Sequence, residues 1–287
     1  MSVFYYKGEF HHAQSLDISF NNRAFRYADG FFEAVRFYNR KPIFWSYHLA
    51  RIEQTCAFLK LEECPSSEML TDLVNNLLMK NDVDTGTLRI VFYRSGGGKY
   101  FPESNMAEIF MEVSGSGLEV YPSPVVTKKA VIFEDQKSSG NPFGNYKLID
   151  KTLHILAAVH ALENQVSEAI LLNEAGYITE AVSSNVFFVS GTDLVTPPLT
   201  DGGLNGVIRR VIIEKAHQFN MNLKEESVLP SQLSNFHEVF TTNTGSGIAS
   251  ISRIGDKVYK SERAEQMQSV LTTLAINSCS DFLGSQP

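Results

Sequence analysis

A lysine at the junction of a loop and a helix is the first residue of this sequence that could do covalent chemistry. Lys147 follows the glycine-, asparagine- and proline-rich segment QKSSGNPFGN and precedes a helical pattern that is apolar at Ile149, Leu153, Leu156 and Val159. A neutral lysine amine attacks carbonyl carbons, and a surrounding rich in cations lowers the pKa of the amine enough to supply it. Most lysines are exposed surface groups, however, and spacing alone leaves that alternative open.

A carboxylate and two glycine-containing turns follow Lys147. Glu180 lies between a strand pattern and the small residues of AVSS, where it could serve a site or cap a turn. In LNGVIRR a glycine opens an amphipathic helix, and TTNTGSGIAS follows a strand. Free backbone N–H groups at such positions bind phosphate, although each segment could equally be an ordinary turn. The lysine and two candidate anion sites form a coherent set in one half of the chain.

The elements that must position these residues alternate between strands and helices in no regular order. Strands are predicted at 2–6, 31–39, 87–94, 107–113, 125–133, 167–172, 184–189 and 238–242, and helices at 46–61, 66–80, 147–162, 205–218 and from 261. This order predicts an α+β (mixed α/β) fold, and neither a Rossmann fold nor a TIM barrel. A Ser-, Gly- and Pro-rich stretch predicts an N-terminal α/β domain over 1–116, a linker over 117–125 and a C-terminal α/β domain over 126–287, which carries the lysine.

Composition excludes several classes of protein. The 287 residues carry a formal net charge of −7 with no basic run, which argues against nucleic acid as a partner. No apolar stretch is long enough to span a membrane, and no signal peptide is recognisable. Three cysteines without a C-x-x-C pair predict reduced thiols in a cytoplasmic protein. The histidines lack companions at ligand spacing, so no metal site is expected.

Several segments together resemble one enzyme family. Lys147 followed by SEAILLN and YITEAVSSNVFFV is similar to the signature of fold-type IV pyridoxal-phosphate enzymes, the class IV aminotransferase family. LNGVIRR downstream and RAFRYADGFFEAVRFY and HLARIEQTCAFL upstream extend the match over nearly the whole chain. The resemblance implies a two-domain fold like that of D-amino acid aminotransferase, pyridoxal 5′-phosphate as cofactor, a small-molecule amino substrate and a homodimer.

The resemblance also implies a role for single residues. Lys147 would bind the cofactor aldehyde covalently and later move a proton at the substrate carbon, while Glu180 would keep the pyridine nitrogen protonated. Arg51 of the HLAR segment, the backbone N–H groups of Val207 and Ile208 and the hydroxyl of Thr244 would bind the phosphate. Tyr27 and Phe32 match positions that line the substrate pocket, although either could be a core residue.

The residues indicate the reaction less narrowly than they indicate the cofactor. Ile208 stands where the aminotransferases usually carry threonine, as in lyases that often have an apolar residue there. LRIVFYRSGGGKYFP also resembles the lyase pattern, with Arg94 and Lys99 as candidates for a dicarboxylate substrate. These features favour 4-amino-4-deoxychorismate lyase, which releases pyruvate and 4-aminobenzoate for folate synthesis. The alternatives are a branched-chain or D-amino acid aminotransferase using 2-oxoglutarate, and a non-catalytic domain that binds the cofactor, which the presence of both Lys147 and Glu180 disfavours.

Overall fold

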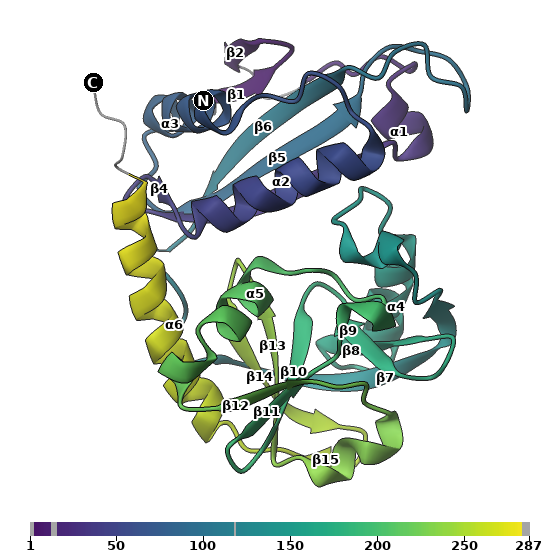
Figure 1. The fold of residues 1–287 in the computed structure, drawn as a ribbon, viewed down its shortest axis with the longest axis vertical. Coiled ribbons are helices and arrows are strands. Elements are labelled where there is room, and N and C mark those ends of the chain that lie inside the picture. Colours follow the sequence, from purple (N-terminus) through teal and green to yellow (C-terminus); the bar gives the residue numbers. More distant parts are fainter. Residues whose placement is uncertain (1–2, 13–15, 118, 283–287) are drawn as a thin grey trace. The chain divides into compact units, whose positions relative to one another are not determined.

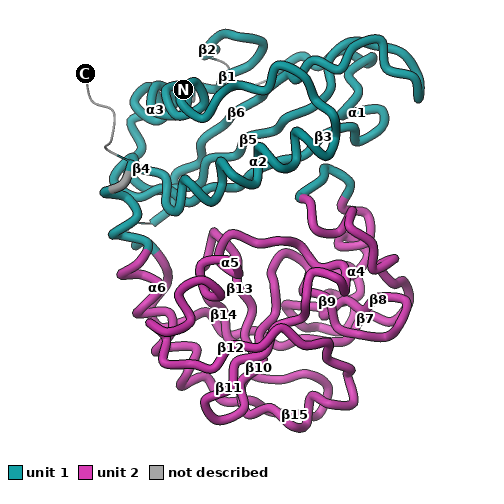
Figure 2. The backbone as a smooth tube through the Cα atoms, viewed as in Figure 1, with its two compact units in different colours: residues 1–120, 147–150, 275–287 teal, residues 121–146, 151–274 magenta. Residues whose placement is uncertain are grey.

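The computed structural model describes residues 3–12, 16–117 and 119–282, and the chain divides into two compact units. Unit 1 contains residues 1–120, 147–150 and 275–287, and unit 2 contains residues 121–146 and 151–274 (Figure 2). Each unit has its own sheet and its own apolar core.

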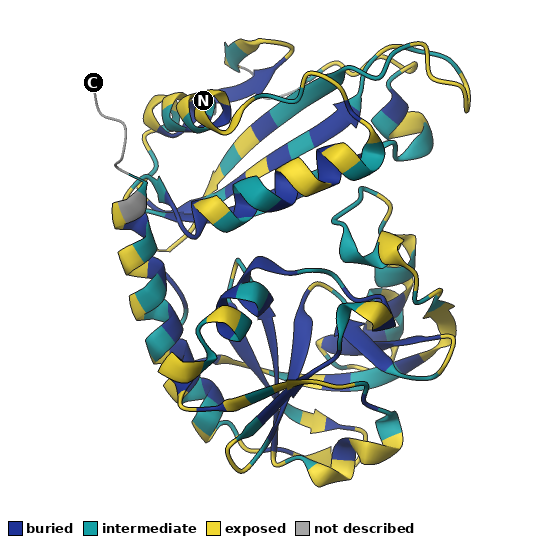
Figure 3. Ribbon diagram, in the orientation of Figure 1, coloured by how far each residue is buried: buried dark blue, intermediate teal, exposed yellow. Residues whose placement is uncertain are grey.

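Unit 1 is built on an antiparallel six-stranded sheet in the order β2-β1-β6-β5-β3-β4 (Figure 1). The strands are β1 Val3–Tyr6, β2 Glu9–His12, β3 Gly30–Tyr38, β4 Lys41–Pro42, β5 Gly86–Arg94 and β6 Ala107–Gly115, and the helices are α1 Arg23–Tyr27, α2 Trp45–Leu59 and α3 Ser67–Asn81. Leu88, Ile90 and Phe92 are fully buried at alternate positions of β5, as a strand with one core face requires (Figure 3). Helices α2 and α3 contribute the other side of this core.

Unit 2 is built on a nine-stranded mixed sheet in the order β12-β11-β10-β13-β14-β7-β8-β9, with β15 paired to β14. Its strands are β7 Val126–Ser138, β8 Glu168–Asn173, β9 Ile178–Ala181, β10 Asn185–Ser190, β11 Asp193–Thr196, β12 Asn222–Glu225, β13 Glu238–Asn243, β14 Gly247–Ile254 and β15 Lys257–Val258. Its helices are α4 Thr152–Glu163, α5 Val207–Glu214 and most of α6 Glu262–Asp281, with short 3-10 turns η1 Pro142–Asn145, η2 Leu199–Asp201, η3 Ala216–Phe219 and η4 Pro230–Asn235. The mixed α/β order confirms the predicted fold class.

The segment that carries the lysine belongs to unit 1, which differs from the predicted domain division. The Phe32 N–H donates to the Lys147 carbonyl at 3.0 Å, and the Ile149 N–H donates to the Gly30 carbonyl at 3.1 Å. These two bonds attach residues 147–150 to β3, so they cannot begin a helix as the sequence pattern predicted. The division after residue 120 does fall within the predicted linker, but residues 147–150 and 275–287 return to unit 1.

Helix α4 accordingly begins at Thr152, and it presents a different face to the sheet from the one the apolar pattern predicted. Ala157 and Ala161 are buried, whereas Leu156 and Val159 are exposed. The two alanines pack with Phe133, Ala169 and Leu171 of β7 and β8. Small side chains let the helix approach the strands closely, so size rather than hydrophobicity selects the buried face.

The cysteines also differ from the expectation of three reduced thiols. Cys56, in the last turn of α2, and Cys64, in the segment that follows, form a disulfide. Cys279 is a free thiol buried in α6, and burial raises its pKa above the usual range. The prediction was wrong because it considered only the number and spacing of the cysteines. It did not consider the turn after α2, which brings Cys64 back to Cys56.

The described residues contain neither a membrane-spanning helix nor a metal-binding group of side chains. Within these residues, no helix is long and apolar enough to cross a membrane. Within the same residues, histidine, cysteine, aspartate and glutamate side chains form no group of three or more that could hold a metal ion.

Candidate active site

Lys147 lies beside an aromatic ring that a second cation also contacts. Its Nζ is 4.6 Å from the centroid of the Phe32 ring. The guanidinium carbon of Arg89, on β5, lies 4.3 Å from the same centroid. Both contacts are within cation–π range. The structure therefore places Phe32, which the resemblance assigns to the substrate pocket, beside the lysine, and it adds Arg89, to which the sequence reasoning gave no role.

Arg51 is part of a buried charged cluster, not a surface charge of helix α2. Its Nε donates to Oε1 of Glu33 at 2.7 Å, and its Nη2 donates to Oε2 at 2.7 Å. Nδ1 of His48 also contacts Oε2 of Glu33 at 2.7 Å. Only 4% of Arg51 and none of Glu33 or His48 is exposed. A bidentate pair of this kind holds the plane of the guanidinium in one orientation.

The pKa values of this cluster show which groups carry charge. Burial alone would raise the pKa of Glu33, but attraction by Arg51 and His48, together with their hydrogen bonds, lowers it to about 2. Burial lowers the pKa of His48, and the charges of Arg51 and Lys147 act in the same direction against the attraction of Glu33. The cluster is therefore an ionised carboxylate held by a guanidinium and an imidazole. Since a carboxylate only accepts, Nδ1 of that imidazole carries the proton.

The position of Glu33 on β3 explains why the carboxylate is buried. Phe31, Glu33, Val35 and Phe37 alternate along the strand, and all four are buried. His48 and Arg51 are three residues apart on α2 and so lie on one face of the helix. A charged residue at an inward strand position, opposite a helix with two basic residues at that spacing, was the signal available in the sequence.

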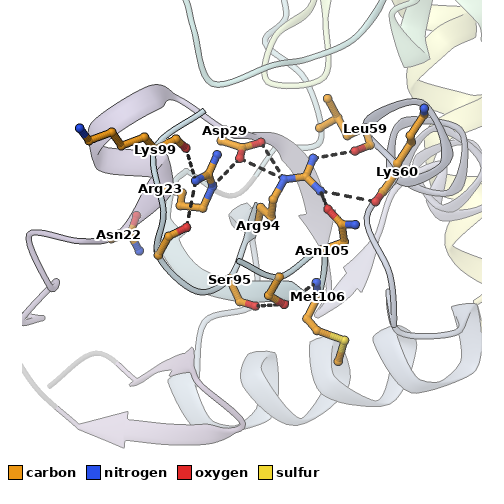
Figure 4. A network of polar contacts seen from close by, with 12 residues as sticks. Asn22, Arg23, Asp29, Leu59, Lys60, Arg94, Ser95, Lys99, Asn105 and Met106 are labelled. Carbon is orange, nitrogen blue, oxygen red and sulfur yellow. Dashed lines mark hydrogen bonds and ion pairs between the residues drawn. The ribbon is translucent and has the colours of Figure 1, made fainter. Parts of the chain in front are cut away.

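Arg94 is held by the protein in a way that leaves it poorly suited to substrate. Its Nε donates to Asp29 at 3.0 Å, its Nη1 to the Asn105 side chain at 2.6 Å and its Nη2 to the Leu59 carbonyl at 2.7 Å (Figure 4). Arg23 donates to the same Asp29 at 2.7 Å. This network links β5 to the end of α2 and to the loop that follows the strand. The geometry favours a structural role over the predicted role in substrate binding.

Arg23 and Tyr27 hold the loop of residues 95–106 from the other side. Arg23 Nη1 donates to the carbonyls of Gly97 at 3.1 Å and Lys99 at 2.7 Å. The Tyr27 ring lies 5.7 Å from the exposed ring of Tyr100. Tyr27 thus contacts this loop, and Lys99 takes part through its backbone while its side chain is exposed.

In unit 2, Glu180 is held by two donors. Nε2 of His154, on α4, lies 3.0 Å from Oε1, and the Leu204 N–H donates to Oε2 at 3.1 Å. The side chain of Glu180, on β9, is 9% exposed. Its carboxylate therefore has a fixed plane and a small accessible edge. His154 is a second residue that sequence reasoning assigned no role.

The segment that holds Glu180 leads directly into α5. Asn185 Nδ2 donates to the Leu204 carbonyl at 2.7 Å, and Gly206 is the N-terminal cap of the helix. A Cβ on Gly206 would lie 2.0 Å from Oδ1 of Asn185, so any other residue here would have to displace that side chain and its hydrogen bond to Leu204. No side chain caps this end, and the first-turn residues Val207 and Ile208 are almost fully buried. Backbone N–H groups at such an end attract an anion.

Thr244 lies in the tight turn between β13 and β14. Oδ1 of Asn243 accepts from the N–H groups of Gly245 and Ser246, both at 2.9 Å. Nδ2 of Asn243 donates to the Ser184 hydroxyl at 2.9 Å. Asn243 thereby fixes the turn, and with it the backbone of Thr244. The arrangement in unit 2 can hold a ring nitrogen at Glu180 and an anion at α5, and the arrangement in unit 1 offers an amine and a buried guanidinium.

The Glu33 cluster should contribute stability that depends on pH. Replacing Glu33 with glutamine leaves Arg51 buried without its counter-charge, so the free energy of unfolding should fall by roughly 3 kcal/mol at pH 7. Because the pKa of Glu33 is lowered in the folded state from 4.5 to about 2, this difference from the wild type is complete above pH 4.5 and shrinks as the pH falls towards 2. Urea denaturation of both proteins at pH 7 and pH 3 measures it. A difference that stays constant over this range would contradict the assignment of an ionised Glu33.

Comparison with known proteins agrees with these features. The sequence model described as "Amino-transferase class IV" matches residues 30–254. Aminodeoxychorismate lyase of Bacillus subtilis (strain 168) is 27% identical over 92% of this chain and 90% of its own length. A D-alanine aminotransferase of Staphylococcus epidermidis is 26% identical over 88% of this chain and 89% of its own length.

Among solved structures, a branched-chain amino acid aminotransferase of T.th., complexed with N-(5′-phosphopyridoxyl)-L-glutamate, has the same fold. Its TM-score is 0.83 at 19% identity, over 96% of this chain and 94% of that one. The family match covers both units and includes Phe32, Arg51, Lys147, Glu180 and the N-terminus of α5. The chain therefore belongs to the class IV aminotransferase family of fold-type IV enzymes, which depend on pyridoxal 5′-phosphate.

Proposed function

We propose that this protein is a pyridoxal 5′-phosphate enzyme that binds its cofactor covalently through Lys147. Glu180 would accept a hydrogen bond from the protonated pyridine nitrogen. The phosphate would be bound by Arg51, the backbone N–H groups of Val207 and Ile208, and the Thr244 hydroxyl. These assignments follow the family resemblance, and the buried guanidinium of Arg51, the two donors on Glu180 and the uncapped N-terminus of α5 support them.

The chemistry of the residues fits this cofactor. The buried Glu33–Arg51 pair presents a rigid guanidinium, and Gly206 places no side chain at the N-terminus of α5, which no side chain caps. Bound there, the cofactor would supply an electron sink for the electron pair left when the substrate loses a proton. Lys147 would take that proton from the substrate carbon and return it. Glu180 would keep the proton on the ring nitrogen, because an anionic oxygen beside that nitrogen favours its protonated form.

For the reaction, we propose 4-amino-4-deoxychorismate lyase. The observation that carries this choice is Ile208, a side chain that is 1% exposed and has no hydroxyl where the aminotransferases usually have threonine. The substrate has the combined composition of 4-aminobenzoate and pyruvate, so proton transfer and cleavage of the enol ether bond balance without any amino acceptor. Lys147 is the residue proposed to move that proton. The released 4-aminobenzoate would serve folate synthesis.

Aminotransferase activity towards branched-chain or D-amino acids is the second candidate. The identity of this chain to a D-alanine aminotransferase, 26%, is nearly equal to its 27% identity to an aminodeoxychorismate lyase. Identity therefore does not separate the two reactions. The amino acceptor separates them chemically, because a transaminase must deliver the amino group to a 2-oxo acid such as 2-oxoglutarate.

We also propose that Arg89, in place of Arg94, contacts a carboxylate of the substrate. Arg89 shares the Phe32 ring with the reactive lysine and is exposed, whereas Arg94 is engaged by Asp29, Asn105 and Leu59. An exposed guanidinium beside the reacting amine can bind an anionic substrate without losing contacts that hold the fold.

A homodimer located in the cytoplasm completes the proposal. Helix α4 exposes Ile155, Leu156, Val159 and Leu162 on the side away from its buried alanines. An apolar helix face of this kind on a soluble enzyme is typical of a surface that another subunit covers. Analytical ultracentrifugation measures this directly. Sedimentation of the wild type as a monomer at micromolar concentration would rule the dimer out.

The lyase proposal predicts product without an acceptor. Purified protein reconstituted with cofactor should release pyruvate and 4-aminobenzoate in equal amounts from 4-amino-4-deoxychorismate, in the absence of any 2-oxo acid. The same preparation should transfer no amino group from D-alanine or L-leucine to 2-oxoglutarate. Coupled lactate dehydrogenase and glutamate assays read the two activities. Turnover that depends strictly on 2-oxoglutarate would favour the aminotransferase instead.

One pair of variants should distinguish the role of Arg89 from that of Arg94. Arg89→Gln should raise the KM for the lyase substrate roughly tenfold, the effect of one charge-assisted hydrogen bond, and leave the thermal midpoint unchanged. Arg94→Gln should lower the free energy of unfolding by about 2–3 kcal/mol through loss of its contacts to Asp29 and Asn105. Steady-state kinetics and thermal denaturation of both variants test this. The reverse pattern, a stable Arg94→Gln with raised KM, would restore Arg94 as the substrate residue.

A further inference from the structure

The two donors on Glu180 come from different parts of unit 2. Leu204 contributes a backbone N–H from the segment before α5, and His154 contributes Nε2 from the first turn of α4. A carboxylate only accepts hydrogen bonds, so Nε2 of His154 carries a proton in this contact whatever the charge of the ring. Each oxygen of Glu180 thus accepts one bond, and each retains a further lone pair.

The direction of the His154 side chain follows from its place on the helix. Ala157 and Ala161 follow His154 by three and seven positions, so the three residues share one face of the helix. The two alanines pack on β7 and β8, and Leu171 of β8 pairs with Glu180 of β9. The face that packs on the sheet therefore carries His154 towards the strand of the carboxylate. Its side chain is 20% exposed.

We propose that His154 is a positioning residue for Glu180 and sets how strongly this carboxylate holds the ring nitrogen of the cofactor. The inference rests on the proposed binding of pyridoxal 5′-phosphate. A carboxylate held at one oxygen only can rotate about its χ3 torsion, whereas bonds to both oxygens fix its plane. His154 supplies the second bond, so Glu180 meets the ring nitrogen in one orientation instead of several.

A substitution that removes this hydrogen-bond donor should weaken the binding of the cofactor. For His154→Leu, the dissociation constant of the apoprotein for pyridoxal 5′-phosphate should rise roughly tenfold. His154→Gln retains an N–H that can reach the carboxylate and should restore most of the affinity. His160→Leu is the matched control, because His160 lies on the same helix and its Nδ1 is 3.7 Å from the exposed Asp135. Its affinity should equal that of the wild type.

A cofactor analogue distinguishes this role from a general effect on folding. In 1-deazapyridoxal 5′-phosphate a C–H replaces the ring nitrogen, so Glu180 has no partner there. His154→Leu should change the affinity for this analogue less than twofold. The effect of His154→Leu on pyridoxal 5′-phosphate should also vanish in a Glu180→Ala background, since the two residues act through one contact.

The outcomes separate the inference from the proposed function. If wild-type protein fails to bind pyridoxal 5′-phosphate, the proposed function is wrong. If the wild type binds it and His154→Leu binds it equally well, only the role of His154 is refuted. Equal losses for the cofactor and for its deaza analogue would also refute that role, because the residue would then act on something other than the ring nitrogen.

Discussion

Two backbone hydrogen bonds to β3 determine where the reactive lysine lies in unit 1. The Phe32 N–H binds the Lys147 carbonyl, and the Ile149 N–H binds the Gly30 carbonyl. These bonds flank an antiparallel bridge between Phe31 and Leu148, and Nζ of Lys147 lies beside the Phe32 ring. A Cβ at Gly30 would lie 2.3 Å from the Phe92 carbonyl, so the strands approach too closely here for any side chain. The same strand carries Glu33, one residue beyond Phe32, into the buried cluster with Arg51.

In both Glu33 and Glu180, hydrogen-bond donors hold a buried carboxylate in place. Glu33 is held by Arg51 and His48, and Glu180 is held by His154 and the Leu204 N–H. A buried carboxylate is costly unless donors satisfy it, and donors on both oxygens also fix its direction. In unit 1 the fixed carboxylate orients a guanidinium, and in unit 2 the carboxylate itself is the group that we propose binds the cofactor. Preorganisation by hydrogen bonds is thus the feature common to both.

Sequence patterns anticipated the mixed α/β fold, and the family motifs led to Lys147, Arg51 and Glu180. They did not anticipate the attachment of residues 147–150 to β3, because pairing between segments about a hundred residues apart leaves no local periodicity. The buried face of α4 was mistaken because Ala157 and Ala161 carry a weaker hydrophobic signal than the exposed Leu156 and Val159. The hydrogen bonds of Arg94 to Asp29 and Asn105 were not anticipated either, since a loop motif shows which residues are present and not which acceptors hold them. No motif marks His154, and only the folded chain places its Nε2 3.0 Å from Oε1 of Glu180.

The identity of the cofactor-binding lysine is the claim on which the rest depends. Borohydride reduction of the protein with pyridoxal 5′-phosphate, followed by proteolysis and mass spectrometry, locates the modified residue directly. The account predicts a single phosphopyridoxyl group on Lys147 and none on a Lys147→Ala variant treated in the same way. Equal labelling of that variant, or stoichiometric modification of another lysine in the wild type, would contradict it.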